Sequence, residues 1–223
     1  RNYDGYNLAS VTYTLENINL LKPITLVSDF QIGSEYSLLS SSLDLRWMLP
    51  NKHWLIWRNF GGVFLNNTLG GPDDPPTPFS LGLSGTQDYL FDYELIGRSD
   101  KSGIWSQQFF TSEGGFKGPT GVYANSYLFA SNLSLPLVTP FRYKGLRPSI
   151  GLYGDVGVAD SFDKLYWDYG LRVSVFTDFL ELYLPIQNHN TNFLTSPGYL
   201  QSLRFVFNLD PSEIIERIRR GYY

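Results

Sequence analysis

The segment Glu113–Gly121, EGGFKGPTG, combines four glycines with a single lysine, a composition that phosphate-binding loops share. A P-loop needs the spacing G-x-x-x-x-G-K-[ST] between a strand and a helix. Here Lys117 precedes a glycine, Pro119 follows that glycine, and the next segment has the pattern of a strand. The spacing excludes a phosphate-binding loop. It predicts instead a loop with permissive backbone geometry that presents one apolar side chain, Phe116, and one cation.

The residue types that most often perform catalysis are sparse and badly spaced in this chain. The two histidines, His53 and His189, fall in different loops and form no H-E-x-x-H zinc motif. The sequence GLSGT at 82–86 lacks the spacing of a G-x-S-x-G nucleophile elbow. Cysteine is absent, which excludes disulfides, thiolate metal sites and cysteine nucleophiles. We predict no catalytic residue, metal ligand or cofactor within this chain, and leave open whether it belongs to an enzyme.

Three carboxylates, Asp155, Asp168 and Glu181, fall on the polar side of segments that alternate like strands. Paired carboxylates are able to perform acid–base chemistry. Charged side chains are, however, ordinary in the lumen of a membrane barrel. We expect these three residues to line such a lumen together rather than to form a catalytic pair.

Almost every segment that would position these residues alternates with a period of two, the period of a strand. In WDYGLRVSVF, the side chains of Tyr169, Leu171 and Val173 fall on one side, and those of Asp168 and Arg172 fall on the other. About eleven segments share this pattern and predict strands near 6–16, 23–32, 38–49, 53–66, 81–97, 104–113, 122–135, 147–158, 165–177, 179–188 and 202–209.

Alternation alone permits a soluble sandwich or a membrane barrel, and strand length favours the barrel. Most segments have about 10 to 14 residues, whereas strands of soluble proteins have about 5–6 and membrane-spanning strands need about 9–11. Aromatic residues make up 17% of the chain. Those near strand ends suit the two interfacial girdles of a membrane barrel. The tryptophans expected there are Trp47, Trp54, Trp57, Trp105 and Trp167.

Short and long connections alternate, as in outer-membrane barrels with short periplasmic turns and long external loops. The turn at Thr177 and Asp178 is tight, whereas the connections at 66–79 and 188–199 are long. The strand count is odd, although single-chain bacterial barrels have an even number. We therefore expect either missing residues within 17–50 or an additional strand near 81–103.

The tail, 210–223, has the pattern of a short helix, with Asp210 as its cap and Pro211 in its first turn. The chain thus divides into a barrel, 1–209, and a periplasmic helix or tail, 210–223. Lys and Arg number 17 against 21 Asp and Glu, for a net charge of −4. Nucleic acid is excluded as the main partner, because phosphate binding requires a basic face.

The loop and its flanking strands resemble the BamA/TamA-like outer-membrane barrels. Those barrels fold a long external loop inward through an Arg-Gly-Phe/Tyr element, and five strands follow that loop. Here the element is Gly-Gly-Phe-Lys-Gly, with the cation after the aromatic residue. The resemblance implies that Asp155, in GLYGDVGVA, is the wall carboxylate that contacts Lys117. The loop residues to which it assigns this inward fold are Gly114, Gly115, Phe116, Lys117 and Gly118.

A second resemblance covers nearly the whole chain. YDGYNLA, SGTQDYLFDYELIGRSDKSGIWSQQFF, EGGFKG, LYGDVG and FLELYLPI are similar to the C-terminal barrel of bacterial gluzincin-type zinc metallopeptidases. In that family an aminopeptidase-like domain precedes an outer-membrane barrel, and the zinc ligands lie in the peptidase domain. The resemblance implies that this chain is the anchor and not the catalyst.

We therefore expect an all-β, antiparallel transmembrane barrel of about 10–16 strands with a short C-terminal helix. Its expected function is to anchor an upstream, peptidase-like domain in the bacterial outer membrane, with the lumen closed by the loop at 113–121. The expected partners are outer-membrane lipid and other outer-membrane proteins. A BamA-like insertase or translocation pore is the main alternative, and a soluble ligand-binding β-sandwich is the third.

Overall fold

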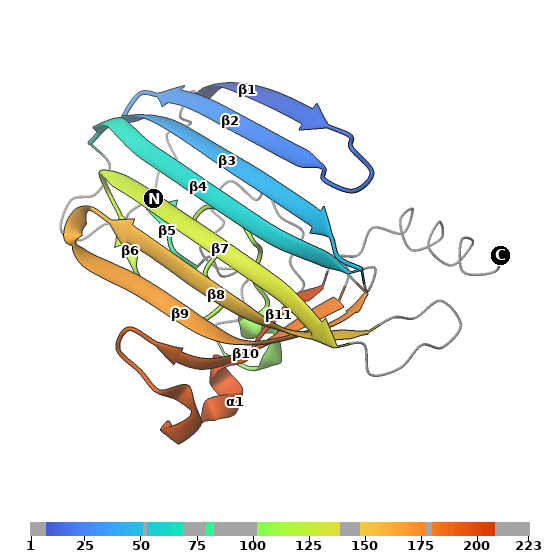
Figure 1. Ribbon diagram of the computed structural model, residues 1–223. Coiled ribbons are helices and arrows are strands. Elements are labelled where there is room, and N and C mark those ends of the chain that lie inside the picture. Colours follow the sequence, from blue (N-terminus) through green and yellow to red (C-terminus); the bar gives the residue numbers. More distant parts are fainter. Residues whose placement is uncertain are drawn as a thin grey trace.

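The computed structural model describes residues 8–50, 53–68, 79–82, 102–138, 148–176 and 180–207. These residues are mostly strand, which confirms the all-β prediction (Figure 1). The main sheet holds β1 (Leu8–Asn17), β2 (Ile24–Gly33), β3 (Tyr36–Met48), β4 (Trp54–Asn67), β7 (Tyr127–Val138), β8 (Ser149–Ala159), β9 (Ser161–Phe176), β10 (Leu180–Asn188) and β11 (Arg204–Phe207). A two-stranded sheet pairs β5 (Phe79–Ser80) with β6 (Tyr123–Ala124).

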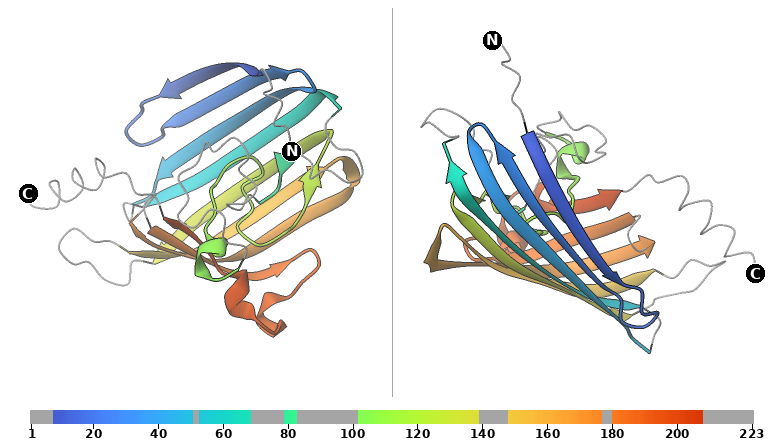
Figure 2. Two further views of the ribbon diagram at one scale, coloured as in Figure 1. Left: turned by 180° about the vertical axis from the view of Figure 1, so that it is seen from behind. Right: turned by 90° about the horizontal axis from the view of Figure 1, so that it is seen from above.

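The nine strands follow chain order, and every neighbouring pair is antiparallel. The sheet curls, and the segment between η2 (Ile104–Gln107) and β6 lies on its concave side (Figure 2). Strands β1 and β11 are the two edges of the sheet, and no ladder joins them in the described residues. What is observed is therefore a curled antiparallel sheet with two edges.

Most expected strands are present, with ends that shift by a few residues. The strand expected at 104–113 is wrong: that stretch begins with the 3-10 helix η2 and continues without regular pairing. The stretch does not alternate strictly, because Ile104 and Trp105 are adjacent apolar residues, as are Phe109 and Phe110. Five strands of the main sheet, β7 to β11, do follow the loop.

Residues 17–50 run through two successive hairpins, β1–β2 and β2–β3, without an interruption. The strand expected at 81–97 and the additional strand expected near 81–103 fall mostly on residues 83–101, which lie outside the described residues, as does the tail helix expected at 210–223. The described part of the chain has one short α-helix, α1 (Tyr199–Ser202), which precedes β11. No helix in the described ranges is long and apolar enough to cross a membrane.

The two faces of the sheet have opposite chemistry, as β8 demonstrates. Its concave-side residues Tyr153 and Asp155 are each 3% exposed, whereas its convex-side residues Leu152 and Val156 are 42% and 39% exposed. The same alternation continues in β9, where Arg172 is buried between the exposed Leu171 and the half-buried Val173. Charged and polar side chains therefore face inward, and aliphatic side chains face outward.

Candidate functional site: an inward-folded loop and its wall carboxylates

The loop expected from EGGFKGPTG lies on the concave side of the sheet (Figure 2), and backbone hydrogen bonds to residues 79–82 hold it there. Strand β5 pairs with β6 and thereby joins the two ends of the loop region. The Phe116 amide donates to the carbonyl of Leu81 at 2.7 Å, and the Leu81 amide donates to the carbonyl of Val122 at 3.1 Å. Residues 79–82 are thus sandwiched between two parts of the loop and fix its path.

A tight turn at Glu113–Gly115 aims the loop at the wall. Both Glu113 (φ 45°) and Gly115 (φ 64°) adopt left-handed backbone conformations. The Glu113 carboxylate accepts a hydrogen bond from the Ser80 amide at 2.5 Å, and its carbonyl accepts one from Arg58 Nη1 at 2.5 Å. Because an L-residue with a side chain is strained at positive φ, these two contacts compensate at Glu113, and glycine removes the strain at position 115.

Phe116 packs in an apolar cluster between loop and wall. Its side chain is 1% exposed, and it clusters with Leu81 and Leu128, which are each 0% exposed. Gly157 on β8 leaves room for this cluster, because a Cβ there would lie 3.3 Å from Phe116 Cε1 and 2.7 Å from the Phe129 carbonyl oxygen. The apolar core of the described molecule therefore lies between the sheet and the loop.

Lys117 and Asp155 form a buried ion pair, the contact that the resemblance implied. The Lys117 ammonium nitrogen Nζ donates to Asp155 Oδ1 at 2.6 Å, and the Lys117 amide donates to Oδ2 at 3.0 Å. The two residues are each 3% exposed. Asn132 on β7 completes the group, since its Nδ2 donates to Asp155 Oδ1 at 3.0 Å and to the Gly114 carbonyl at 2.9 Å. Asp155 thus accepts hydrogen bonds from both loop and wall.

Asp168 lies directly opposite Asp155 in the β8–β9 ladder and faces the same side. Its Oδ2 accepts a hydrogen bond from the Gly118 amide at 2.5 Å, while its Oδ1 is buried without a partner in the described residues. A side chain at position 118 would collide with this carboxylate. Glycine is thus required at position 118, because the loop backbone lies so close to Asp168. The two wall aspartates accept hydrogen bonds from the amides of two consecutive loop residues, Lys117 and Gly118.

Glu181 belongs to a different cluster. Its carboxylate accepts hydrogen bonds from Arg172 Nε at 3.0 Å, from Arg172 Nη2, and from the Tyr183 hydroxyl at 2.5 Å. Glu181 is opposite Ser174, six positions along β9 from Asp168, or about 20 Å at the usual rise of a strand. The three expected carboxylates therefore divide between the loop contact and a separate Arg172–Glu181–Tyr183 cluster, although all three are buried on the concave side.

Four of the five expected tryptophans lie on or beside the wall. Trp47 stacks on Trp57 with ring centroids 6.2 Å apart, beside the connection between β3 and β4, where Trp54 also lies. Trp167 stacks on Tyr169 at 6.0 Å and accepts, at its carbonyl, the amide of His189 at the far end of β10. Trp105 differs, because it lies in η2, off the main sheet.

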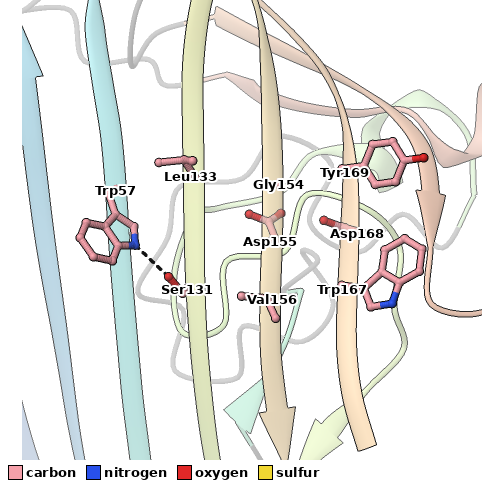
Figure 3. A pocket seen from close by; sticks show the side chains of 9 residues that line it. All are labelled: Trp57, Ser131, Leu133, Gly154, Asp155, Val156, Trp167, Asp168 and Tyr169. Atoms are coloured by element: carbon pink, nitrogen blue, oxygen red, sulfur yellow. Dashed lines mark hydrogen bonds between the residues drawn. The ribbon is translucent and has the colours of Figure 1, made fainter.

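An open hollow of about 610 Å³ lies on the wall over Gly154 (Figure 3). The side chains of Trp57, Leu133, Val156, Trp167 and Tyr169 border it, and the Trp57 indole donates to Ser131 Oγ at 2.8 Å. Among the described residues beyond its chain neighbours, the atom nearest an ideal Cβ at Gly154 is the Asp168 carbonyl oxygen, at 4.0 Å. The absence of a side chain at Gly154 thus leaves the floor of the hollow open.

The side chains of this site hold the loop against the wall, and the two histidines lie too far apart to form one catalytic group. His53 precedes β4 and His189 follows β10, and these positions lie at opposite ends of the antiparallel sheet. No single triad can therefore use both histidines. The sequence reasoning did not assign a site role to Arg58, Asn132 or Gly157. The available signal was that each falls on the polar or small-residue side of its strand.

Comparisons of the chain with protein-family models, with curated proteins and with solved structures give no match. Family membership therefore stays an expectation.

Proposed function

We propose that this chain is the wall of an outer-membrane β-barrel whose interior is closed by its own inward-folded loop, and that it anchors an upstream domain. The observation that carries the proposal is that the sheet buries its charged side chains and exposes its aliphatic ones, the reverse of a soluble protein. Asp155, Asp168 and Arg172 are at least 96% buried on the concave side, while Leu152, Val156 and Leu171 are exposed on the convex side. Lipid-facing aliphatic residues that alternate with polar inward residues are characteristic of membrane barrels.

A soluble sandwich would require the opposite arrangement. Soluble proteins rarely expose contiguous apolar patches larger than a few hundred Å². Here the exposed aliphatic and aromatic side chains recur on nearly every strand of the sheet, and the set includes Val11, Phe30, Leu39, Trp57, Phe129, Leu133, Ile150, Leu165 and Leu182. Hydrocarbon is the solvent in which such a face is stable. We therefore assign lipid as the partner of the convex face.

The loop favours an anchor over an open pore. Phe116 fills the space against the wall, and Lys117 is fixed to it by an ion pair. Because Phe116 and Lys117 are buried and attached to the wall, the loop obstructs the diffusion of solutes along the concave side of the sheet. The identity of the anchored domain follows from the resemblance to gluzincin-type peptidases, which predicts an H-E-x-x-H motif in the part of the polypeptide that precedes the barrel.

Solubility and electrophoretic behaviour test the membrane assignment. We expect the protein to require detergent for extraction and to migrate faster in a gel when unheated than when boiled, because a closed sheet resists dodecyl sulfate. Extraction by buffer alone, with migration independent of heating, would contradict the proposal. Zinc-dependent hydrolysis of aminoacyl substrates by the purified complete polypeptide tests the anchored peptidase separately.

A BamA-like insertase is the second candidate, because β1 and β11 are not paired in the described residues. An insertase would be required for the assembly of other barrels. Depletion of the protein should then lower the amounts of unrelated outer-membrane barrels, whereas depletion of an anchor should lower only the activity of its own domain.

A further inference from the structure

One edge of strand β1 pairs with no strand among the described residues. Its ten residues pair with β2 on one side, from Leu8↔Gly33 to Asn17↔Ile24. Every residue from Ala9 to Asn17 is exposed, and Val11 and Tyr13 reach 68% and 57%, more than Leu152 or Val156 inside the sheet. In hydrocarbon, backbone groups along such an edge have no water with which to form hydrogen bonds. This edge therefore requires a partner strand.

The partner of β1 is not β11, because the direction of the strands forbids an antiparallel seam. Nine strands, each antiparallel to the next, leave the first and the last running in the same direction. Antiparallel closure from β11 back to β1 therefore needs an odd number of additional strands. The lengths disagree as well, since β11 has 4 residues and β1 has 10.

The outer edge of β11 is also occupied. Gln108 forms a parallel bridge with Phe205, the Phe109 amide donates to the Phe205 carbonyl at 3.0 Å, and Gln108 Nε2 donates to the Phe207 carbonyl at 3.1 Å. Gln108 and Phe109 are 1% and 2% exposed, so this contact is part of the packed interior. A strand that approached β11 at these residues would have to displace Gln108 and Phe109.

We propose that the free edge of β1 binds a further amphipathic wall strand of the same polypeptide, one of an odd number that complete the barrel, and that this strand precedes β1 in the chain. The proposal rests on the membrane-barrel function proposed above. The chemistry of the partner follows from β1, which directs Val11, Tyr13 and Leu15 outward and alternates them with Ser10, Thr12 and Thr14. Consecutive antiparallel strands are usually neighbours, as β1 to β4 are here, so the strand beside β1 is the preceding one.

Photo-crosslinking in the complete polypeptide, extracted in detergent, tests this inference. Tyr13 would be replaced by p-benzoylphenylalanine, which keeps an aromatic ring at an outward position, and crosslinked peptides would be identified by mass spectrometry. We expect two products, one with β2 and one with a segment of the same polypeptide that precedes Leu8. Amide hydrogen exchange should agree, with protection at consecutive β1 residues instead of at every second one.

The same probe at Phe30 on β2 is the matched control, because this residue already has Val11 and Leu39 as its two ladder partners. It should crosslink only to β1 and β3. A Tyr13 product with residues 204–207, with a second copy in a mixture of light and isotope-labelled protein, or with another polypeptide would overturn the inference, and so would a product with β2 alone. Each of these results leaves detergent dependence intact, whereas failure of the membrane assignment appears as solubility in buffer.

Discussion

Lys117 is a lysine enclosed by protein, and its ion pair with Asp155 is the loop's principal polar attachment to β8. Removing one member of a buried pair leaves the other charge uncompensated, at a cost of about 3–5 kcal/mol. We expect Lys117→Met to loosen the loop and raise permeability. The measurements are the rate of liposome swelling and the protease sensitivity of residues 109–122.

Two variants serve as controls for Lys117→Met. Lys117→Arg retains the cation and should behave nearly like the unmodified protein. Lys164→Met removes an exposed lysine that lies over the Tyr166 ring, with its Nζ 4.9 Å from the centroid, and should leave permeability unchanged. Unchanged swelling and protease resistance in Lys117→Met would show that the ion pair does not hold the loop.

Gly115 and Gly121 allow backbone strain to be separated from steric collision. Both have positive φ, 64° and 58°, but a Cβ at Gly115 would lie 2.8 Å from Asn132 Oδ1, whereas a Cβ at Gly121 would meet no atom of the described residues within 4 Å. Gly121→Ala should cost about 1–2 kcal/mol from strain, and Gly115→Ala should cost more. The temperature at which the folded gel band disappears measures both, and equal shifts would argue against the collision.

At the scale of a strand, β8 tests which face meets lipid. Val156 lies near its middle on the convex side. A cationic residue at the bilayer midplane destabilises a barrel by about 2–4 kcal/mol, and one near the interface by about 0–1. Phe162 is 70% exposed beside the β8–β9 turn. We expect Val156→Arg to lower the free energy of unfolding in lipid far more than Phe162→Arg does. Similar stability of the two variants in a urea titration would contradict a lipid-facing β8.

The connection after β10 is expected to respond to acid. Burial lowers the pKa of His189, and the positive charge of Lys164 lowers it further. The folded connection therefore favours neutral His189, so its contribution to stability is complete above the unfolded pKa of about 6.5 and is lost as the pH falls through the lowered folded value. Proteolysis of residues 189–203 should accelerate at acidic pH.

His189→Phe provides the comparison for that acid response. It keeps a ring against Tyr166, whose centroid lies 4.8 Å from the imidazole centroid, but cannot titrate. The acid-induced acceleration should disappear in this variant. An acceleration of the same size in both proteins would assign the acid response to another group.

Strands could be predicted from the sequence wherever alternation persists over many residues, as it does in β8 and β9. The stretch at 104–113 could not, because the pairing of Gln108 with Phe205 depends on a strand almost a hundred residues later. Lys117 and Asp155 were associated through a family resemblance, and no periodicity connects them. The role of Asn132 cannot be predicted, because a single amide side chain in a strand forms no recognisable sequence motif. Its role depends on the fold, which brings Gly114 and Asp155 within hydrogen-bond distance of its amide group.

At the scale of the whole molecule, the tryptophans report which surfaces touch lipid. Trp57 is on the wall and 38% exposed, whereas Trp105 is 42% exposed but lies in η2, against Phe205. In single-tryptophan variants reconstituted with brominated lipids, we expect strong fluorescence quenching of Trp57 and little quenching of Trp105. Aqueous acrylamide should give the reverse order. Equal quenching of both by bromine would argue that η2 also lies in the bilayer.

The seat of the loop has a consequence for the order of folding. Arg58 on β4, Asn132 on β7, Asp155 on β8 and Asp168 on β9 all contact Glu113–Gly118, at sequence separations of 18 to 55 residues. Contacts that distant in sequence form late, since closing long loops costs entropy before any contact repays it. The four strands must be in register before the loop finds its partners. A strand that is out of register by one residue turns its inward carboxylate to the outer face of the sheet. The loop therefore binds only to a wall whose strands are in the correct register.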